Sequence, residues 1–283
     1  MLRHGFRAMG TEVELVLDAD DGAPALAEAE HEFRRLETLL SRFLPDSELS
    51  RLNRKGTLRV GPELSELVRL SLAARDETGG RFDPTVHDAL VAAGYDRTFE
   101  LVAGGTPGTQ ARPQCGGRVT IDDSGIVTLE PGYRLDLGGV AKGWAADGAL
   151  ALLSQSGPAL VNAGGDVACA GRPWPVGVTT PAGNVTLELD GGALATSGRD
   201  RRRWIQDGVE RHHLIDPSTG LPAETDLLTV TASASTAAEA EILAKSLFLS
   251  GTAEQAAAEA DERGTPTVLV TCNGRTLLAG GLR

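Results

Sequence analysis

Hydrophobic and polar positions along the chain follow two periods, which predict both strands and helices. Residues 11–19 (TEVELVLDA) alternate between apolar and polar side chains, a pattern typical of a half-buried strand. Residues 24–43 instead carry apolar side chains three and four positions apart, which predicts a helix with one buried face. A second helix is predicted over 62–77, with Pro62 in its first turn and two glycines after its end.

The remaining pattern mixes both kinds of element without a regular strand–helix alternation. It predicts a hairpin at 118–132 that turns at Asp122–Gly125, a strand, glycine turn and helix over 135–157, two strands over 159–171, a strand at 227–235, helices at 237–250 and from 252, and a strand at 266–273. Residues 98–117 are expected to form a surface loop. The mixture favours an α+β fold, with mixed or antiparallel sheets, packed helices and one domain over residues 1–283.

Composition and charge narrow the class of protein. Hydrophobic residues make up 41% of the 283 residues, which is enough for a packed core. The net charge of −12 argues against nucleic acid or an anionic membrane as the main partner. The three cysteines are far apart, which fits a reducing compartment and supports neither a disulfide framework nor a zinc site. No apolar run suits a signal peptide or a membrane span, so we expect a cytoplasmic protein without membrane insertion.

The segment LDLGGVAKGWAAD (residues 135–147) is the first candidate for chemistry. Gly138 and Gly139 permit a sharp turn with exposed N–H groups near a helix start, and Lys142 follows one turn later. This arrangement suits a phosphate, but neither the Walker nor the dinucleotide-binding pattern is present. From this segment alone, an ordinary strand-to-helix turn is the favoured interpretation.

Other polar motifs also have an ordinary explanation as turns. Asn162 and Asp166 flank a glycine pair in LVNAGGDV, and Asp83 precedes a proline in TGGRFDPTV. An arginine-rich stretch at 199–203 suits a solvated face. In HHLIDPSTGLP, His213 is a candidate general base, because an ordinary histidine pKa lies near 6.5. Adjacent residues of a strand point to opposite faces, so only one of the two histidines can face a site.

The predicted helix at 237–250 carries an acid and a base one turn apart. Thr236 and Glu239 form a capping-box pattern at its start. At 100° per residue, Glu241 and Lys245 lie together among small and apolar side chains. The opposite side, expected to face solvent, carries Glu239, Ser246 and Ser250. A buried ion pair is a poor source of stability, so a structural role and a role in a site both stay open.

These segments together occur in an order that resembles one known family. MGTEVEL, SRFLPDSELSRLN, TGGRFDPTV, LDLGGVAKGWAAD, LVNAGGDV, ATSG, HHLIDPSTGLP and VTASASTAAEAEILAKSLFLSG stand in the order found in the ApbE-type FAD:protein FMN transferases. The resemblance extends from about residue 5 to residue 283. It implies a single α+β domain related to the T-fold. It also implies an enzyme that splits the pyrophosphate of FAD and attaches FMN by a phosphoester to a Thr or Ser of a target protein, usually with Mg²⁺.

Site residues follow from the resemblance by matching motifs. The implied FAD contacts are Met9, Phe43, Arg81, Phe82, Asp83, Asp136, Gly139, Lys142 and Ile215. His213, in the motif that ends at Asp216, is implied to deprotonate the acceptor hydroxyl, and both residues are candidate catalytic residues. No acceptor motif is clear in this chain, so the implied acceptor is another protein.

The sequence departs from the family at the implied metal site. Glu241 stands where the family usually has Asp, and Lys245 where it usually has Thr; both positions ligate Mg²⁺ in the family, with backbone carbonyls near positions 139 and Ala244. A protonated lysine offers donors only and cannot ligate Mg²⁺. We therefore hypothesise that the Lys245 ammonium takes the metal position with Glu241 as its counter-ion. Two functions stay open: a working transferase, and a non-transferring FAD-binding protein or slow FAD pyrophosphatase.

Overall fold

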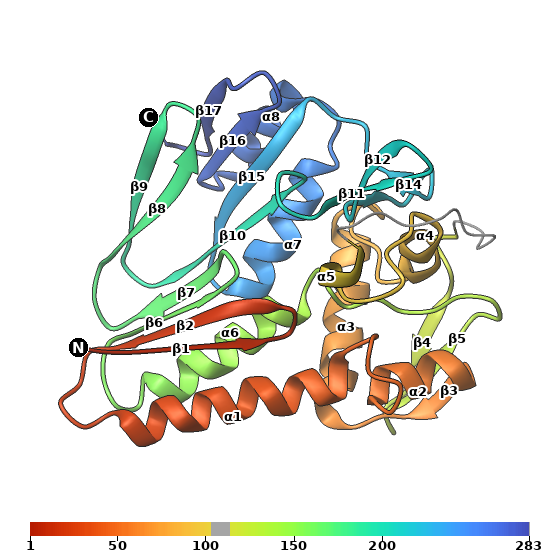
Figure 1. The fold of residues 1–283 in the computed structure, drawn as a ribbon, viewed down its shortest axis with the longest axis horizontal. Coiled ribbons are helices and arrows are strands. Elements are labelled where there is room, and N and C mark those ends of the chain that lie inside the picture. The colour runs from red at the N-terminus through yellow and green to blue at the C-terminus, as the bar shows by residue number, and fades with distance from the viewer. Residues whose placement is uncertain (103–113, 283) are drawn as a thin grey trace. The chain divides into compact units, whose positions relative to one another are not determined.

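The chain divides into two compact units that are both built from separated segments. The computed structural model describes residues 1–102 and 114–282. Unit 1 comprises residues 1–37, 140–198 and 225–283, and unit 2 comprises residues 38–139 and 199–224 (Figure 1). The prediction of one domain over 1–283 stays a prediction.

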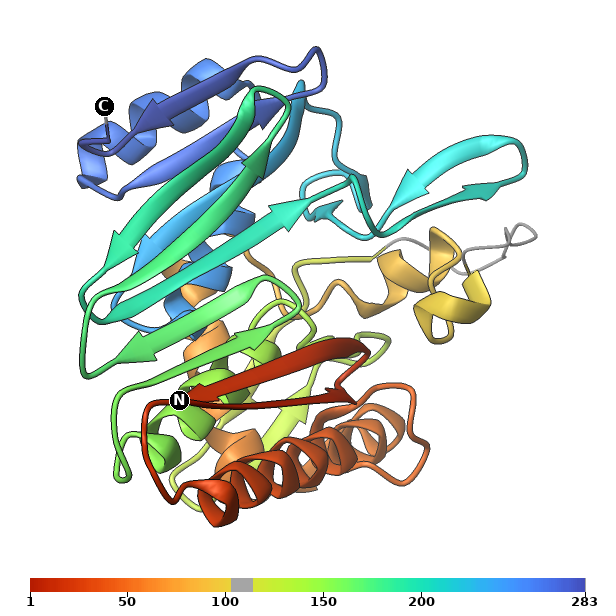
Figure 2. The same ribbon diagram turned by 60° about the vertical axis from the view of Figure 1, so that its left-hand side comes forward.

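Unit 1 is organised around an eight-stranded sheet in which every neighbouring pair is antiparallel. In sheet order, the strands are β1 (Leu2–Ala8), β2 (Thr11–Leu17), β6 (Ala159–Ala163), β7 (Asp166–Ala170), β10 (Gly192–Gly198), β15 (Leu227–Ala234), β16 (Thr267–Thr271) and β17 (Thr276–Ala279). Hairpins join β1 to β2, β6 to β7 and β16 to β17 (Figures 1 and 2).

Both faces of this sheet are covered within unit 1. The helices α6 (Ala141–Leu153), α7 (Ala237–Phe248) and α8 (Ala253–Arg263) cover one face: α6 packs on β6 and β7, α7 on β10 and β15, and α8 on β16 and β17 (Figure 2). Helix α1 (Ala23–Leu40) packs its Phe33 ring against Phe6 of β1. On the other face, the hairpin of β8 (Trp174–Thr180) and β9 (Gly183–Leu189) joins a buried cluster with β2, β7 and β10. Burial on both faces explains why the central strands are rich in small apolar residues.

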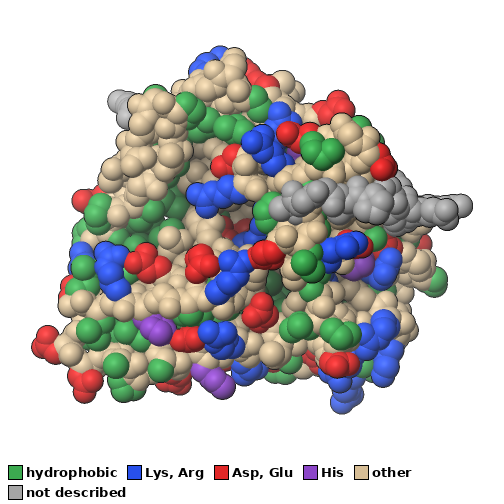
Figure 3. Space-filling model, viewed as in Figure 1, with side chains coloured by type: hydrophobic (Ala, Val, Ile, Leu, Met, Phe, Trp, Pro, Cys, Tyr) green, Lys and Arg blue, Asp and Glu red, His purple; other side chains and the backbone are tan. Residues whose placement is uncertain are grey.

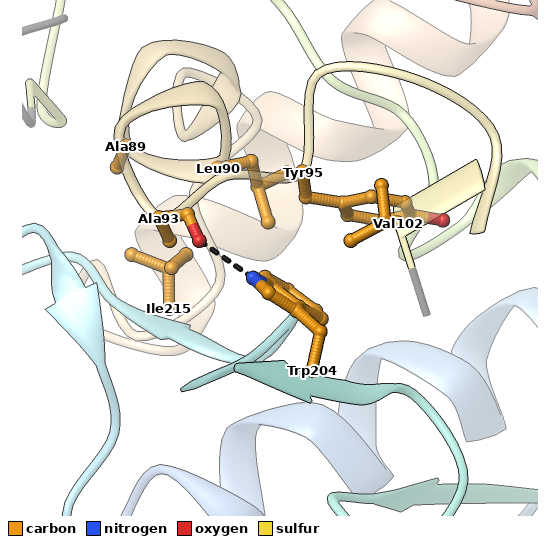
Figure 4. Packing of buried hydrophobic residues seen from close by; sticks show 7 residues of the cluster. All are labelled: Ala89, Leu90, Ala93, Tyr95, Val102, Trp204 and Ile215. Carbon is orange, nitrogen blue, oxygen red and sulfur yellow. Dashed lines mark hydrogen bonds between the residues drawn. The ribbon is translucent and has the colours of Figure 1, made fainter. Parts of the chain in front are cut away.

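Unit 2 is smaller and joins short elements around its own apolar clusters. Its elements are α2 (Glu48–Lys55), β3 (Thr57–Arg59), α3 (Pro62–Glu77), α4 (His87–Ala92), α5 (Phe99–Val102), β4 (Val119–Ile121), β5 (Ile126–Leu129), β11 (Arg203–Gln206), β12 (Val209–His212), β13 (Ile215–Asp216) and β14 (Leu221–Pro222). Trp204 of β11 packs on α4 and donates its indole N–H to the Ala93 carbonyl at 2.8 Å (Figure 4). Ile215 lies in the same cluster.

The α+β class with antiparallel sheets is confirmed, and so are most of the elements predicted from periodicity. Helix α3 has the predicted bounds, and the hairpin of β4 and β5 turns at the predicted place. Thr236 caps α7, since its hydroxyl accepts from the backbone N–H of Glu239 at 3.2 Å. Glu239 is exposed, as predicted, and Glu241 is buried.

Two predictions are wrong, and a third is wrong over part of its range. Residues 135–137 form no strand: the N–H of Leu135 donates to Asn53 Oδ1 and that of Asp136 to the Pro84 carbonyl, so these backbone groups are satisfied outside a sheet. The loop predicted at 98–117 contains α5, while its residues 103–113 lie outside the described residues. Ser246 is fully buried instead of facing solvent, because nearly the whole circumference of α7 is covered.

Two further observations concern the distribution of charged side chains on the surface and the length of the apolar helices. Acidic and basic side chains are interspersed on the face shown in Figure 3. Within the part of the chain that the structure describes, no helix has both the length and the apolar character needed to cross a membrane.

Candidate functional site

The ammonium of Lys142, the second residue of α6, lies between two buried carboxylates. Its Nζ is 2.8 Å from Asp166 Oδ2 and also contacts Glu241 Oε1. The second oxygen of Glu241, Oε2, accepts a hydrogen bond from the backbone N–H of Gly143 at 3.1 Å. The side chains of Lys142, Asp166 and Glu241 are 15%, 4% and 7% exposed. Glu241 is therefore bonded to a lysine that lies 99 residues earlier in the chain.

Lys245, one turn after Glu241 on α7, adds a second positive charge to this group. We call Lys142, Asp166, Glu241 and Lys245 the Lys142 cluster. Burial raises the pKa of Glu241, and the charge of Asp166 raises it further, whereas Lys142 and Lys245 both lower it. With both acids and both bases ionised, the cluster carries two charges of each sign and is balanced within itself.

Close packing of α6 on α7 brings Lys142 and Glu241 together. A Cβ added at Gly143 would lie 2.5 Å from the Ala237 carbonyl oxygen, so only glycine permits this approach. One turn along α6, Asp147 accepts hydrogen bonds from the N–H groups of Ala237 at 2.7 Å and Ala238 at 3.0 Å. These N–H groups belong to the first turn of α7 and have no partner inside the helix. Asp147 therefore fixes the start of α7, and with it the position of Glu241.

Two tight turns meet at the end of the sheet that carries Asp166. Met9 and Gly10 connect β1 to β2 with φ values of 51° and 70°, and a left-handed methionine costs about 1–2 kcal/mol. A Cβ at Gly164, in the turn between β6 and β7, would lie 2.1 Å from Thr11 Oγ1. The Asn162 side chain accepts from the Gly165 N–H at 3.0 Å, which completes this turn. A strained residue that is not glycine favours a functional role over a purely structural one.

In unit 2, Arg42 connects two of the residues predicted to contact FAD. Its Nε lies 2.6 Å from Asp136 Oδ2, and both side chains are more than nine-tenths buried. Its guanidinium lies over the Phe43 ring at 4.2 Å and the Tyr95 ring at 4.7 Å, and Nη2 donates to the Tyr95 carbonyl at 2.8 Å. The other oxygen of Asp136 accepts from the Gly138 N–H at 2.8 Å. Phe43 and Asp136 are thus held together by a residue that the motif analysis did not single out.

Asp83 of the RFD segment shapes the chain around itself. Its Oδ1 accepts from the backbone and hydroxyl of Thr85, both at 2.8 Å, and its Oδ2 accepts from the Gly116 N–H at 2.6 Å. Phe82 is buried, and Arg81 donates to the Thr78 carbonyl at 3.3 Å. The neighbouring Cys115 thiol stays protonated near neutral pH and is therefore a poor nucleophile, because burial and the charge of Asp83 raise its pKa to about 12. These contacts of Asp83 agree with the prediction that it shapes a turn.

The two adjacent histidines have different environments. His212 is buried at the end of β12; its Nε2 lies 3.1 Å from the Ala223 carbonyl and its Nδ1 accepts from the Leu214 N–H at 3.3 Å. This assigns the proton to Nε2 of a neutral ring, and burial lowers the pKa of His212 to about 4. His213 is half-buried. Asp216, which follows Ile215, accepts from the N–H and hydroxyl of Ser218 at 2.9 and 2.7 Å.

The predicted site residues thus fall into two groups. Unit 1 contains Met9, Lys142, Glu241, Ala244 and Lys245, and unit 2 contains Phe43, Arg81, Phe82, Asp83, Asp136, Gly139, His213, Ile215 and Asp216. Within unit 1 the structure joins Lys142 to Glu241, and within unit 2 Arg42 joins Phe43 to Asp136. Sequence reasoning missed Arg42 and Asp147, although Arg42 adjoins Phe43 in the SRF motif and Asp147 ends LDLGGVAKGWAAD. It treated Asp166 as a turn residue only.

Comparisons with known proteins agree over most of the chain. A family model described as the ApbE family matches residues 9–269. A FAD:protein FMN transferase of Salmonella typhimurium is 30% identical over 264 residues, which span 86% of this chain and 71% of that protein. A crystal structure of the ApbE protein of Thermotoga maritima is 28% identical, with a TM-score of 0.87 over 98% of this chain and 96% of that one. The apo flavinyl transferase ApbE of Pseudomonas stutzeri, at 24% identity and a TM-score of 0.83, supports the fold over 98% of this chain and 95% of that one. The chain belongs to the ApbE family.

Proposed function

We propose that this protein is a FAD:protein FMN transferase. The hydroxyl oxygen of a Thr or Ser in a target protein attacks the phosphorus on the FMN side of the FAD pyrophosphate. The bond from that phosphorus to the bridging oxygen breaks, and AMP leaves with that oxygen. The products are a protein–FMN phosphoester and AMP. The observation that carries this proposal is the match to the ApbE family over residues 9–269, together with a FAD:protein FMN transferase that is 30% identical over 86% of this chain.

We assign the proton acceptor to His213. A general base at neutral pH needs a ring that can take up a proton, and His212 does not meet this requirement because burial lowers its pKa to about 4. Asp216 is a positioning residue in this scheme, since its Oδ1 is used by the Ser218 backbone and hydroxyl. It fixes the turn that follows the segment carrying His213.

Flavin contacts in this proposal come from residues whose positions the fold restrains. The Arg42 guanidinium fixes Phe43 and Asp136, while Asp83 fixes the chain at Thr85 and Gly116. Met9 is held in a left-handed turn at the end of β1. Rigid presentation of such groups reduces the entropy lost when a substrate binds.

The residues at the implied Mg²⁺ position do not fit this ion as they stand. Mg²⁺ requires oxygen ligands at about 2.0–2.1 Å in octahedral geometry. Both oxygens of Glu241 are already bonded, to Lys142 Nζ and to the Gly143 N–H, and Lys245 offers no acceptor. Among the described residues, no group of three or more His, Cys, Asp and Glu side chains is arranged to hold a metal. We therefore assign no step of the reaction to a metal at these residues.

We also propose that the protein acts in the cytoplasm. None of the three cysteines, Cys115, Cys169 and Cys272, is paired in a disulfide, which suits a reducing compartment. The acceptor would then be a cytoplasmic protein or a domain that faces the cytoplasm.

Intact-mass spectrometry tests the proposed transfer. A domain that an ApbE relative flavinylates is incubated with this protein and FAD, and its mass and the released AMP are measured together. We expect the acceptor to gain the mass of one FMN less one water, with one AMP released per acceptor. His213→Asn should abolish the gain, whereas Val209→Ala, at an exposed position of the strand β12 that precedes His213, serves as the control.

The alternative function is flavin binding without transfer, or slow FAD hydrolysis. It is favoured by one observation, the engagement of Glu241 by Lys142 where the family places a metal ligand. AMP release without a mass gain on two different acceptors would establish hydrolysis, and tight FAD binding without either product would establish a binding protein.

A further inference from the structure

The Lys142 cluster differs from an ordinary acidic metal site because it already contains positive charges that compensate its acids. Its two carboxylates are almost fully buried, and the ammonium of Lys142 contacts both. Lys142 is anchored on α6, Asp166 starts β7, and Glu241 and Lys245 lie on α7, so three elements of unit 1 hold the four charges. Two buried acids with two bases form a compensated group rather than a pair of acids awaiting a cation.

Each carboxylate depends on Lys142 in a different way. Glu241 combines the Lys142 contact with a hydrogen bond from the Gly143 backbone. The buried Oδ2 of Asp166 accepts no hydrogen bond among the described residues, so the ammonium 2.8 Å away is its compensation. A buried carboxylate oxygen without a compensating charge is costly, which makes Lys142 the essential cation of the group.

A divalent cation would meet two obstacles at this position. It would have to displace the Lys142 ammonium or share both carboxylates with it, and sharing would bring two cations together in a buried site. It would also meet Lys245, which is close enough to act on the charge of Glu241. Like charges brought together in a buried site repel strongly.

We infer that the Lys142 cluster supplies its own positive charge, with Lys142 and Lys245 in place of a divalent cation, and that Asp166 and Glu241 do not bind Mg²⁺. The consequence that FMN transfer proceeds without Mg²⁺ at these residues rests on the proposed function. The metal-binding statement itself does not, because it concerns only the charges of unit 1.

Calorimetric titration of the full chain with MgCl₂, without FAD and after removal of metals with EDTA, tests the inference. We expect no saturable binding by the unmodified protein. The double variant Lys142→Gln, Lys245→Thr leaves the two carboxylates uncompensated, and it should bind Mg²⁺ about tenfold tighter or more, because loss of a single like charge at contact distance exceeds a tenfold factor. The triple variant that adds Glu241→Gln should lose the gained binding.

Two results would overturn the inference. The first is saturable Mg²⁺ binding by the unmodified protein that Glu241→Gln removes, and this arm holds even when the double variant does not fold. The second is a folded double variant, checked by circular dichroism, that gains no Mg²⁺ binding. A thermal-unfolding series in MgCl₂ provides an independent measure, since a ligand that binds only the folded state raises the unfolding temperature.

The same samples separate the two proposals. Mass gain on the acceptor that persists in EDTA supports both of them. No mass gain in Mg²⁺ or in EDTA counts against the proposed transferase, while the titration still decides whether the cluster binds Mg²⁺.

Discussion

Asp147 Oδ1 lies 2.7 Å from the backbone nitrogen of Ala237 and accepts its N–H, so a side chain of α6 caps the first turn of α7. The second oxygen of Asp147 accepts the N–H of Ala238 in the same way. The helix that carries Glu241 and Lys245 is thereby tied to the helix that carries Lys142, and the geometry of the cluster depends on this junction.

Removal of the Asp147 carboxylate should destabilise unit 1. Asp147→Ala leaves two N–H groups of α7 without their acceptors, at a cost of about 1–3 kcal/mol in the free energy of unfolding. Urea denaturation followed by circular dichroism measures this cost. An unchanged midpoint would show that water replaces the carboxylate, and that the cap contributes nothing.

The same residue should impose a pH dependence on stability. Burial raises the pKa of Asp147 above its ordinary value of 3.8, against the opposing effect of the two N–H donors. The folded state therefore holds its proton to higher pH than the unfolded state, and stability is lost as the pH rises from 3.8 through the raised pKa. The difference in free energy of unfolding between the unmodified protein and Asp147→Asn, measured at several pH values, should show this slope, and a flat difference would contradict it.

Gly143 and Gly148 form a matched pair of tests on α6. At Gly143 a Cβ would lie 2.5 Å from the Ala237 carbonyl oxygen, so Gly143→Ala should force α6 and α7 apart and destabilise by about 1–3 kcal/mol. At Gly148 nothing lies within 4 Å of the added Cβ, so Gly148→Ala should stabilise by about 0.4–1 kcal/mol. Thermal unfolding of the two variants checks the opposite signs. Equal effects would mean that helix propensity, and not the close approach, governs both positions.

Arg42 should be the most sensitive arginine of unit 2 to substitution. Arg42→Ala removes the guanidinium that pairs with the buried Asp136, which costs about 3–5 kcal/mol. Arg42→Lys keeps the charge but loses the planar contact with the Phe43 and Tyr95 rings, and should restore only part of the stability. Arg97→Ala, which breaks an exposed pair with Asp96 in the same unit, should leave the urea midpoint unchanged. A loss for Arg42→Ala no larger than for Arg97→Ala would refute the assignment.

His212 should stay neutral throughout the physiological pH range. Burial lowers its pKa from 6.5 to about 4, so the unfolded state binds the proton first as the pH falls. Stability is therefore lost between pH 6.5 and about 4, by at most about 1.4 kcal/mol per pH unit for one proton. NMR titration of the histidine ring signals measures the pKa directly. A His212 signal that titrates near pH 6.5 would contradict the burial and the bond to Ala223.

Local pattern predicted those elements whose limits are set by neighbouring residues. Helix α3 begins with Pro62 and is followed by two glycines with positive φ, and these signals act over one turn. The segment Leu135–Leu137 alternates as a strand does, but alternation records which side chains are buried and not how the backbone is paired. Leu135 and Leu137 are buried, whereas Asp136 binds Arg42. The pattern was therefore correct about the burial of the two leucines, and wrong about the backbone pairing and about Asp136, whose side chain is also buried.

The candidate site was predictable in its residues and not in its pairings. Periodicity placed Glu241 on a covered side of its helix, and the structure agrees. The contact of Glu241 with Lys142, however, depends on a packing between α6 and α7 that only Gly143 allows, and no feature near Glu241 in the sequence specifies it. Arg42 was missed for a similar reason, because Asp136 lies far along the chain. The role of Lys245 as a cation in place of a metal stays a prediction.

The interleaved segments of the two units set the order in which they can be completed during synthesis. All segments of unit 2 have been translated once Glu224 is added to the nascent chain. At that moment the sheet of unit 1 ends at β10, because β15, β16 and β17 follow only at residues 227–279. The edge of β10 that pairs with β15 in the complete sheet then has no neighbour, and the helix that carries Glu241 and Lys245 has not yet been synthesised. Lys142 and Asp166 are therefore synthesised before the second acid and the second base, and the balanced group of charges can form only after α7 has been added to the chain.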